Sequence, residues 1–153
     1  MKKLTISLAT LFSLALFALP ATADLPEKTN RVVNVLEDYG YEVTVGEEYI
    51  EATHEDHLDL TIEAFYDGML FTSYFITGDY GHTNMAAYLE LINELNQGAV
   101  STRYYIDFEG DFLIEGFYPG KYKKKQLEAF LESLYVDEED LYDRADEINE
   151  YLN

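Results

Sequence analysis

The stretch from residue 88 to residue 118 restricts the fold of this chain more than any other part of the sequence. Apolar residues recur every three or four positions up to Leu95, as on one face of a helix, and Gly98 follows where a helix usually ends. Apolar and polar residues then alternate over 102–108 and again over 112–118, which is the period of a β-strand. A helix followed by a hairpin in this way is typical of an α+β domain.

The rest of the chain extends this pattern on both sides. In chain order, the sequence predicts a helix ending at Gly40, strand-like pieces at 41–45 and 49–53, strands at 58–64 and 69–77, a helix at 84–95, the hairpin, and a terminal helix from 127. The first two pieces form either one bent strand or a small hairpin. We expect Asp137 to cap a restart of the terminal helix, with the acidic run 137–140 in solvent. The predicted order is α-β-β-β-α-β-β-α.

Residues 1–23 have the three parts of a secretory signal peptide. A pair of lysines is followed by an apolar run over residues 4–19 and by Ala21-Thr22-Ala23, the small-x-small pattern that signal peptidase accepts. The run is shorter than the roughly 20 residues that span a bilayer. We therefore expect cleavage after this motif, a folded domain over 24–153, and a bacterial protein that is exported, periplasmic or secreted, without membrane attachment after cleavage.

The charge of the chain limits its partners. Acidic residues outnumber basic ones by 30 to 10, which gives a net charge of −20, and all of the acids follow Ala23. Nucleic acids and anionic lipid surfaces are disfavoured because their phosphates require Lys and Arg. The charge suits cationic partners or divalent ions, or it serves only to keep the protein soluble. The chain has no cysteine, so it has neither a disulfide nor a thiol nucleophile.

No group of residues in the sequence points to an enzyme or to a bound cofactor. None of the serines after residue 23 lies in a Gly-x-Ser-x-Gly motif, and no pair of carboxylates is marked as a catalytic acid and base. His54, Asp56 and His57 have the residue types of a zinc, nickel or copper site. A polar turn explains the same cluster without an ion, so we assign no metal ligand, no cofactor and no catalytic residue.

Three segments carry a resemblance to a known family. They are Leu91-Ile92-Asn93-Glu94-Leu95-Asn96 at the end of the second helix, the hairpin 104–117, and 125–134 at the start of the last helix. In these segments and in the order of its elements, the chain resembles the YbjN family, whose fold is shared with class I type III secretion chaperones. The resemblance implies a curved antiparallel sheet with helices packed on it, often a homodimer, and no catalytic residues. Members of this family have been labelled sensory transduction regulators.

The apolar and aromatic residues suggest where a partner binds. The chain has 14 tyrosines, and tyrosine suits interfaces because its ring buries apolar area while its hydroxyl stays wet. Candidate contacts with a partner or a second copy are Met85, Tyr88, Leu89 and Ile92 on the helix at 84–95, and Tyr104 and Tyr105 on the hairpin. We expect an exported, non-enzymatic protein-binding module, regulatory or chaperone-like, that binds a protein partner or forms a homodimer. The alternative is a periplasmic sensor that responds to a ligand or a metal ion.

Overall fold

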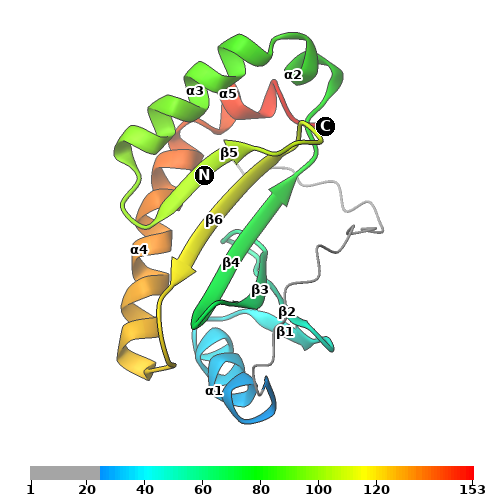
Figure 1. Ribbon diagram of the computed structural model, residues 1–153. Coiled ribbons are helices and arrows are strands. Elements are labelled where there is room, and N and C mark those ends of the chain that lie inside the picture. The colour runs from blue at the N-terminus through cyan, green and yellow to red at the C-terminus, as the bar shows by residue number, and fades with distance from the viewer. Residues whose placement is uncertain (1–24) are drawn as a thin grey trace.

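The computed structural model describes residues 25–153, and the expected signal peptide, residues 1–23, lies outside this range. The elements are α1 (Leu25–Asp38), β1 (Glu42–Val45), β2 (Tyr49–Thr53), β3 (Leu60–Phe65), β4 (Gly68–Phe75), α2 (Asp79–Thr83), α3 (Met85–Gly98), β5 (Thr102–Ile106), β6 (Phe112–Tyr118), α4 (Lys124–Asp143) and α5 (Ala145–Asn149) (Figure 1). Within residues 25–153, no helix is both long and apolar enough to cross a lipid bilayer.

The strands form one six-stranded antiparallel sheet in the order β1-β2-β3-β4-β6-β5 (Figure 1). This arrangement confirms the predicted α+β class with an antiparallel sheet. The two strand-like pieces that the sequence left open form a hairpin, in which the Gly46 N–H donates to the Tyr49 carbonyl oxygen at 2.9 Å across a turn at Glu47 and Glu48. The sheet therefore has one strand more than the predicted order of elements contained.

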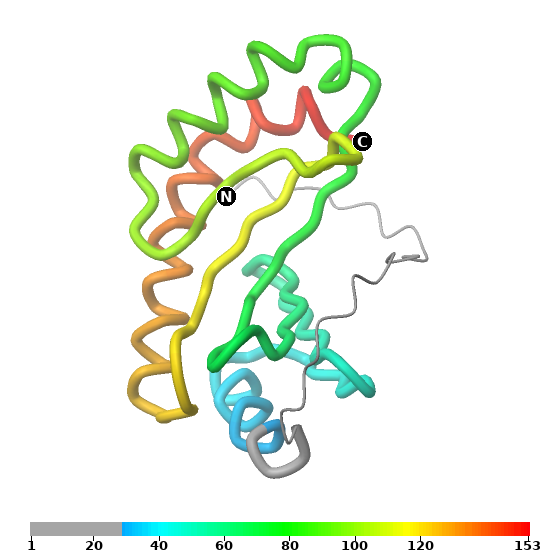
Figure 2. The backbone as a smooth tube through the Cα atoms, in the orientation of Figure 1, coloured from blue at the N-terminus to red at the C-terminus, as the bar shows by residue number. Residues whose placement is uncertain are grey.

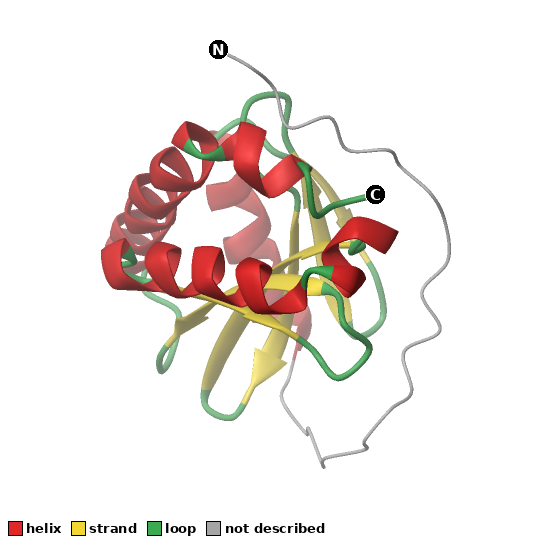
Figure 3. Cartoon of the chain, turned by 90° about the horizontal axis from the view of Figure 1, so that it is seen from above, coloured by secondary structure: helices red, strands yellow, loops and turns green. Residues whose placement is uncertain are grey.

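The longer helices pack on one face of the sheet (Figure 3). Alternate strand residues belong to the two apolar clusters that these helices share with the sheet. One apolar cluster joins α1 and the first half of α4 to the sheet through Leu36, Phe71 and Leu127. A second cluster joins α3, α5 and the end of α4 to the sheet around Tyr88 and Phe112. The strand residues between these core positions lie on the opposite face, which no helix of the described chain covers.

The long C-terminal helix differs from the expectation. α4 is a single helix from Lys124 to Asp143. The prediction that Asp137 caps a new helix is wrong. The prediction that the run 137–140 is solvated is wrong for Asp137 and Glu138, which are only 1% and 4% exposed, and is confirmed for Glu139 and Asp140, which are exposed. The carboxylates of Asp137 and Glu138 point inward because donors from loops packed against α4 hold them there.

The end of the chain lies beside the end of β4 (Figure 2). Thr77 and Leu152 form an antiparallel bridge, and the Gly78 N–H donates to the Tyr151 carbonyl oxygen at 2.8 Å. α2 follows directly after this bridge, in the segment between 77 and 84 where the sequence predicts neither a helix nor a strand. The bridge fixes α5 and α2 against the end of β4.

Candidate interaction surface and polar networks

The face of the sheet opposite the helices, called the open face below, mixes apolar and charged side chains. It is defined by Glu63, Leu70, Thr72, Tyr105, Glu115 and Phe117, whose strand positions alternate with those of the core. Glu63, Leu70 and Phe117 are direct neighbours across β3, β4 and β6. Because adjacent strands lie about 4.8 Å apart, side chains along such a row touch one another.

Glu115 is a carboxylate buried on the open face, with 8% of its surface exposed. Arg103 lies directly opposite on β5 and donates to Glu115 Oε2, from Nε at 2.7 Å and also from Nη2. The Tyr105 hydroxyl donates to Glu115 Oε1 at 2.8 Å, and the Arg103 guanidinium lies 5.3 Å from the centre of the Tyr105 ring. Burial, followed by the hydrogen bond to Glu115, raises the pKa of Tyr105, so this hydroxyl stays protonated at neutral pH. One cation and one hydroxyl thus compensate the buried charge of Glu115.

Glu63 lacks such compensation. Burial raises the pKa of Glu63, and the negative charges of Glu115 and Glu48 raise it further. No Lys, Arg or His within residues 25–153 forms an ion pair with Glu63. The open face therefore carries a negative charge that the described chain does not neutralise.

An aromatic group closes one end of the open face. The rings of Phe65 and Phe117 meet edge to face with centroids 6.0 Å apart, and Tyr66 meets Phe65 in the same way at 4.6 Å. Tyr66 is 83% exposed and Phe117 is 41% exposed. Large apolar side chains held together in solvent are typical of a surface that binds another molecule.

One edge of the sheet is closed by a side chain from α3. The Asn96 amide nitrogen donates to the Tyr104 carbonyl oxygen at 2.7 Å, and the Tyr104 N–H donates to Asn96 Oδ1 at 2.9 Å. Asn96 thus occupies the hydrogen-bonding groups that a further strand would use at the middle of β5. The middle of β5 therefore offers no free backbone groups to a further strand.

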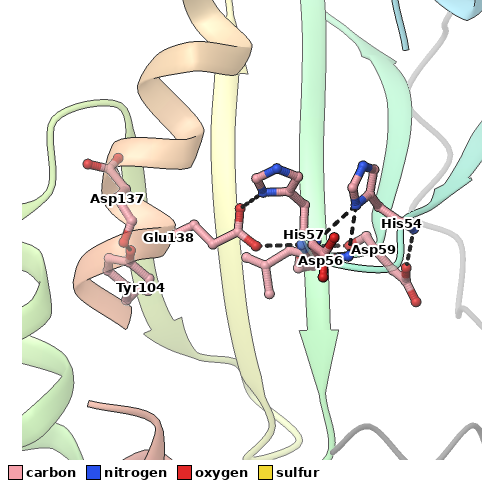
Figure 4. A network of polar contacts seen from close by, with 9 residues as sticks. His54, Asp56, His57, Asp59, Tyr104, Asp137 and Glu138 are labelled. Carbon is pink, nitrogen blue, oxygen red and sulfur yellow. Dashed lines mark hydrogen bonds and ion pairs between the residues drawn. The ribbon is translucent and has the colours of Figure 1, made fainter. Parts of the chain in front are cut away.

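The histidine cluster at the loop between β2 and β3 is a turn with a buried carboxylate behind it (Figure 4). His54 Nδ1 accepts the N–H groups of Asp56 and His57 at 2.9 and 3.1 Å. His57 Nδ1 lies 2.9 Å from Glu138 Oε2, and the Leu58 N–H donates to Glu138 Oε1 at 2.6 Å. The cluster therefore links this loop to α4.

The hydrogen bonds of His54 make its ring unsuited to bind a metal ion. Because His54 Nδ1 accepts two N–H groups, the proton of its neutral ring sits on Nε2, so neither nitrogen has a free lone pair. Within residues 25–153, no three His, Cys, Asp or Glu side chains form a group that could hold a metal ion. His54, Asp56 and His57 are best described as a hydrogen-bonded turn.

Asp137 organises the loop between α3 and β5. Its carboxylate accepts the N–H groups of Val100, Ser101 and Thr102 at 2.7 to 2.8 Å and the hydroxyls of Ser101 and Thr102 at 2.9 Å. Burial is the largest single effect on its pKa and acts upward, but these hydrogen bonds together outweigh it and hold the pKa below its usual value. The Tyr104 hydroxyl also donates to the Asp137 carbonyl oxygen at 2.9 Å, and burial raises the pKa of Tyr104 to about 12.

A small cavity lies between the sheet and α4. Its volume is about 20 Å³, and its lining includes Ser73, Thr102, Tyr135 and Glu138. A space of this size holds about one water molecule. It offers no room for a metabolite.

The structure separates the candidate interface residues into two groups. Tyr88, Ile92 and Tyr104 are 0%, 3% and 4% exposed and belong to the core of the monomer, so they do not present a surface to a partner. Leu89 is 48% exposed on α3, Met85 is partly buried beside it, and Tyr105 lies on the open face.

Sequence reasoning missed the two carboxylates of the open face. The signal that could have found them is the strand alternation itself. It places Glu115 on the same side of β6 as Phe117, and Glu63 on the side of β3 opposite to its core positions.

Comparison with known proteins supports the architecture. No family model matches the sequence, and no curated protein matches it. The antiparallel sheet with helices on one face defines an α+β domain of the YbjN-like fold. Among solved structures, the chain is similar to the crystal structure of YbjN from E. coli, a candidate transcription regulator, with a TM-score of 0.62 and 12% identity, covering 82% of this chain and 95% of that chain. At this identity, the likeness establishes the fold and confirms the predicted architecture.

Proposed function

We propose that this protein is an exported, non-enzymatic protein-binding module with a regulatory or chaperone-like role, and that the open face is its binding surface. The observation that carries this proposal is a sheet face without a covering helix in the described chain, on which the exposed rings of Phe117 and Tyr66 lie beside the buried side chains of Leu70 and Glu115. A protein-sized partner fits such a broad surface, whereas the cavity beside α4 fits only water. We also propose that residues 1–23 are a signal peptide that exports the protein, so that it would bind its partner outside the cytoplasm.

A photo-crosslinking experiment tests the binding surface. A photoreactive phenylalanine analogue replaces Phe117 on the open face, and a matched variant carries it at Val136, which is 53% exposed on α4. We expect one discrete cross-linked partner from position 117 and none from position 136. The partner, once identified and purified, should bind the unmodified protein and bind Phe117→Ser at least about fivefold more weakly, the effect of losing roughly 1 kcal/mol. Equal cross-linking from the two positions would refute the open face as the binding surface.

Self-association and export are separate parts of the proposal. We propose that a homodimer forms through Leu89 and Met85, the candidate residues that α3 leaves at least partly accessible. Sedimentation at tens of micromolar, an ordinary affinity range for dimers, tests it, and a purely monomeric protein at that concentration would refute the dimer. Fractionation of cells that express the full chain tests export, which predicts a processed protein beginning near Asp24 outside the cytoplasm.

A further inference from the structure

The charges of the open face are unbalanced. Glu51, Glu63 and Glu115 lie on this face of β2, β3 and β6, and the cation next to them, Arg103, is already paired with Glu115. The hairpin between β1 and β2 adds Glu48, whose charge acts on Glu63. A partner that brings positive charge to this surface gains Coulomb energy, and a partner that brings negative charge loses it.

The register shows where such a cation would lie. Leu70 and Thr72 run along β4, with Glu63 on β3 on one side and Glu115 on β6 on the other side. Since strands lie about 4.8 Å apart, a positive group above β4 is about one strand spacing from each carboxylate. Arg103 and Tyr105 already form this kind of contact within the protein, a guanidinium beside both a carboxylate and an aromatic ring.

The same face also carries apolar surface. Phe117 is 41% exposed and lies beside Leu70, which is itself buried with 7% of its surface exposed. A segment that carries only charge would leave this apolar surface uncovered, whereas a segment that also carries aliphatic or aromatic side chains would bury it.

We propose that the open face recognises a cationic and apolar segment of a protein partner, with Glu63 as the carboxylate that pairs with an incoming Arg or Lys and with the exposed ring of Phe117 as the apolar contact. This inference rests on the proposed function and specifies its partner. Anionic proteins and phosphate-bearing surfaces are the wrong partners for this face because its acids repel them.

Peptide titrations test the charge and apolar requirements. The probes are a fluorescent peptide of alternating Val and Arg, a Val and Glu peptide, and a Ser and Arg peptide of equal length, each titrated with the purified protein and followed by fluorescence anisotropy. We expect the Val and Arg peptide to bind at least about tenfold more tightly than either control, the effect of roughly 1.4 kcal/mol. Equal affinity for the Ser and Arg peptide would reduce the effect to diffuse attraction and overturn the proposal.

Two matched variants locate the binding. Glu63→Gln removes one charge from the open face, and Glu139→Gln removes one from the exposed side of α4. We expect Glu63→Gln to weaken binding of the Val and Arg peptide by about fivefold at low salt and Glu139→Gln to leave it unchanged. The same loss in both variants would overturn the site.

The outcome is distinguishable from failure of the proposed function. If position 117 cross-links a partner but the Val and Arg peptide does not reduce this cross-linking, the protein-binding function is supported and the recognition of a cationic segment is refuted. If neither position cross-links a partner, the proposed function itself falls.

Discussion

Asp137, in the middle of α4, holds Thr102 at the start of β5 by two hydrogen bonds to one oxygen, from the backbone N–H at 2.8 Å and from the hydroxyl at 2.9 Å. The next residue along β5 is Arg103, which compensates Glu115 on the open face. A buried carboxylate on the covered side of the sheet therefore fixes the strand that carries the one open-face cation paired with Glu115. Stability and the arrangement of the candidate surface are linked through this contact.

Replacing Asp137 by Asn should destabilise the protein strongly. The amide nitrogen would face N–H donors where a carboxylate oxygen now accepts them, and the charge-assisted bonds would be lost. We expect Asp137→Asn to lower the free energy of unfolding by about 2–4 kcal/mol in urea denaturation followed by circular dichroism. Asp143→Asn, at the exposed end of the same helix, is the control and should change it by less than about 0.5 kcal/mol. Similar losses in both variants would contradict the role of Asp137.

The same carboxylate makes stability dependent on pH in a defined direction. The pKa of Asp137 is lowered in the folded protein, so its ionised carboxylate stabilises the fold. This contribution to the unfolding free energy is fully present above the pKa of the unfolded chain, about 3.9, and is lost as the pH falls through the folded pKa. We expect the difference in unfolding free energy between the unmodified protein and Asp137→Asn to be constant from about pH 5 to 7 and to shrink below about pH 4. Urea denaturation at each pH measures it, and a difference that widens on acidification would contradict the lowered pKa.

Removing Asn96 should open the edge of β5. Asn96→Ala leaves the Tyr104 N–H and carbonyl oxygen without their partners, so we expect a loss of about 1–3 kcal/mol in unfolding free energy and faster hydrogen exchange at the Tyr104 amide. Light scattering should also detect association, because an unpaired edge pairs with other strands. Asn93→Ala, an exposed position on the same helix, is the control and should behave like the unmodified protein. Unchanged exchange at Tyr104 in Asn96→Ala would argue against the closed edge.

The sequence predicted the order of most elements because strand and helix periods are local. The alternation over 102–118 and the spacing around Leu95 needed no knowledge of the rest of the chain, and both were confirmed. The sequence does not distinguish a hairpin from one bent strand at Gly46, because the turn Glu47-Glu48 is not among the dipeptides that mark a tight turn.

The buried acids could not be predicted in the same way. The burial of Asp137 depends on donors at Val100 and Ser101, which lie more than thirty residues earlier in the chain. A sequence pattern shows only that 137–140 is acidic, which usually indicates solvent. The histidine pair was ambiguous for a related reason, since residue types alone do not show that His54 Nδ1 is occupied by backbone N–H groups.

The role of His54 as a turn acceptor leads to a prediction that separates it from a metal ligand. Asn can accept the same N–H groups in an Asx turn and Ala cannot, so His54→Ala should lower the unfolding free energy by about 1 kcal/mol and His54→Asn by about half of that. Urea denaturation measures both. Zinc should leave the melting temperature of the unmodified protein unchanged, and a zinc-dependent rise that His54→Ala abolishes would contradict the assigned turn.

Glu63 should cost the protein stability while it serves binding. The pKa of Glu63 is raised in the folded protein, so its negative charge destabilises the fold above that folded pKa. This destabilisation disappears as the pH falls below the pKa of the unfolded chain, about 4.3. We expect Glu63→Gln to raise the unfolding free energy at pH 7, by less than about 0.5 kcal/mol because the side chain is screened by solvent, with no gain at pH 4 and a smaller gain in high salt. Glu139→Gln serves as the control and should show no such pH-dependent gain. Glu63→Gln should also weaken binding of the Val and Arg peptide. A gain in stability together with a loss of binding would distinguish a residue that serves recognition from one that serves folding. A loss of stability at pH 7 would contradict the predicted destabilising effect of the Glu63 charge.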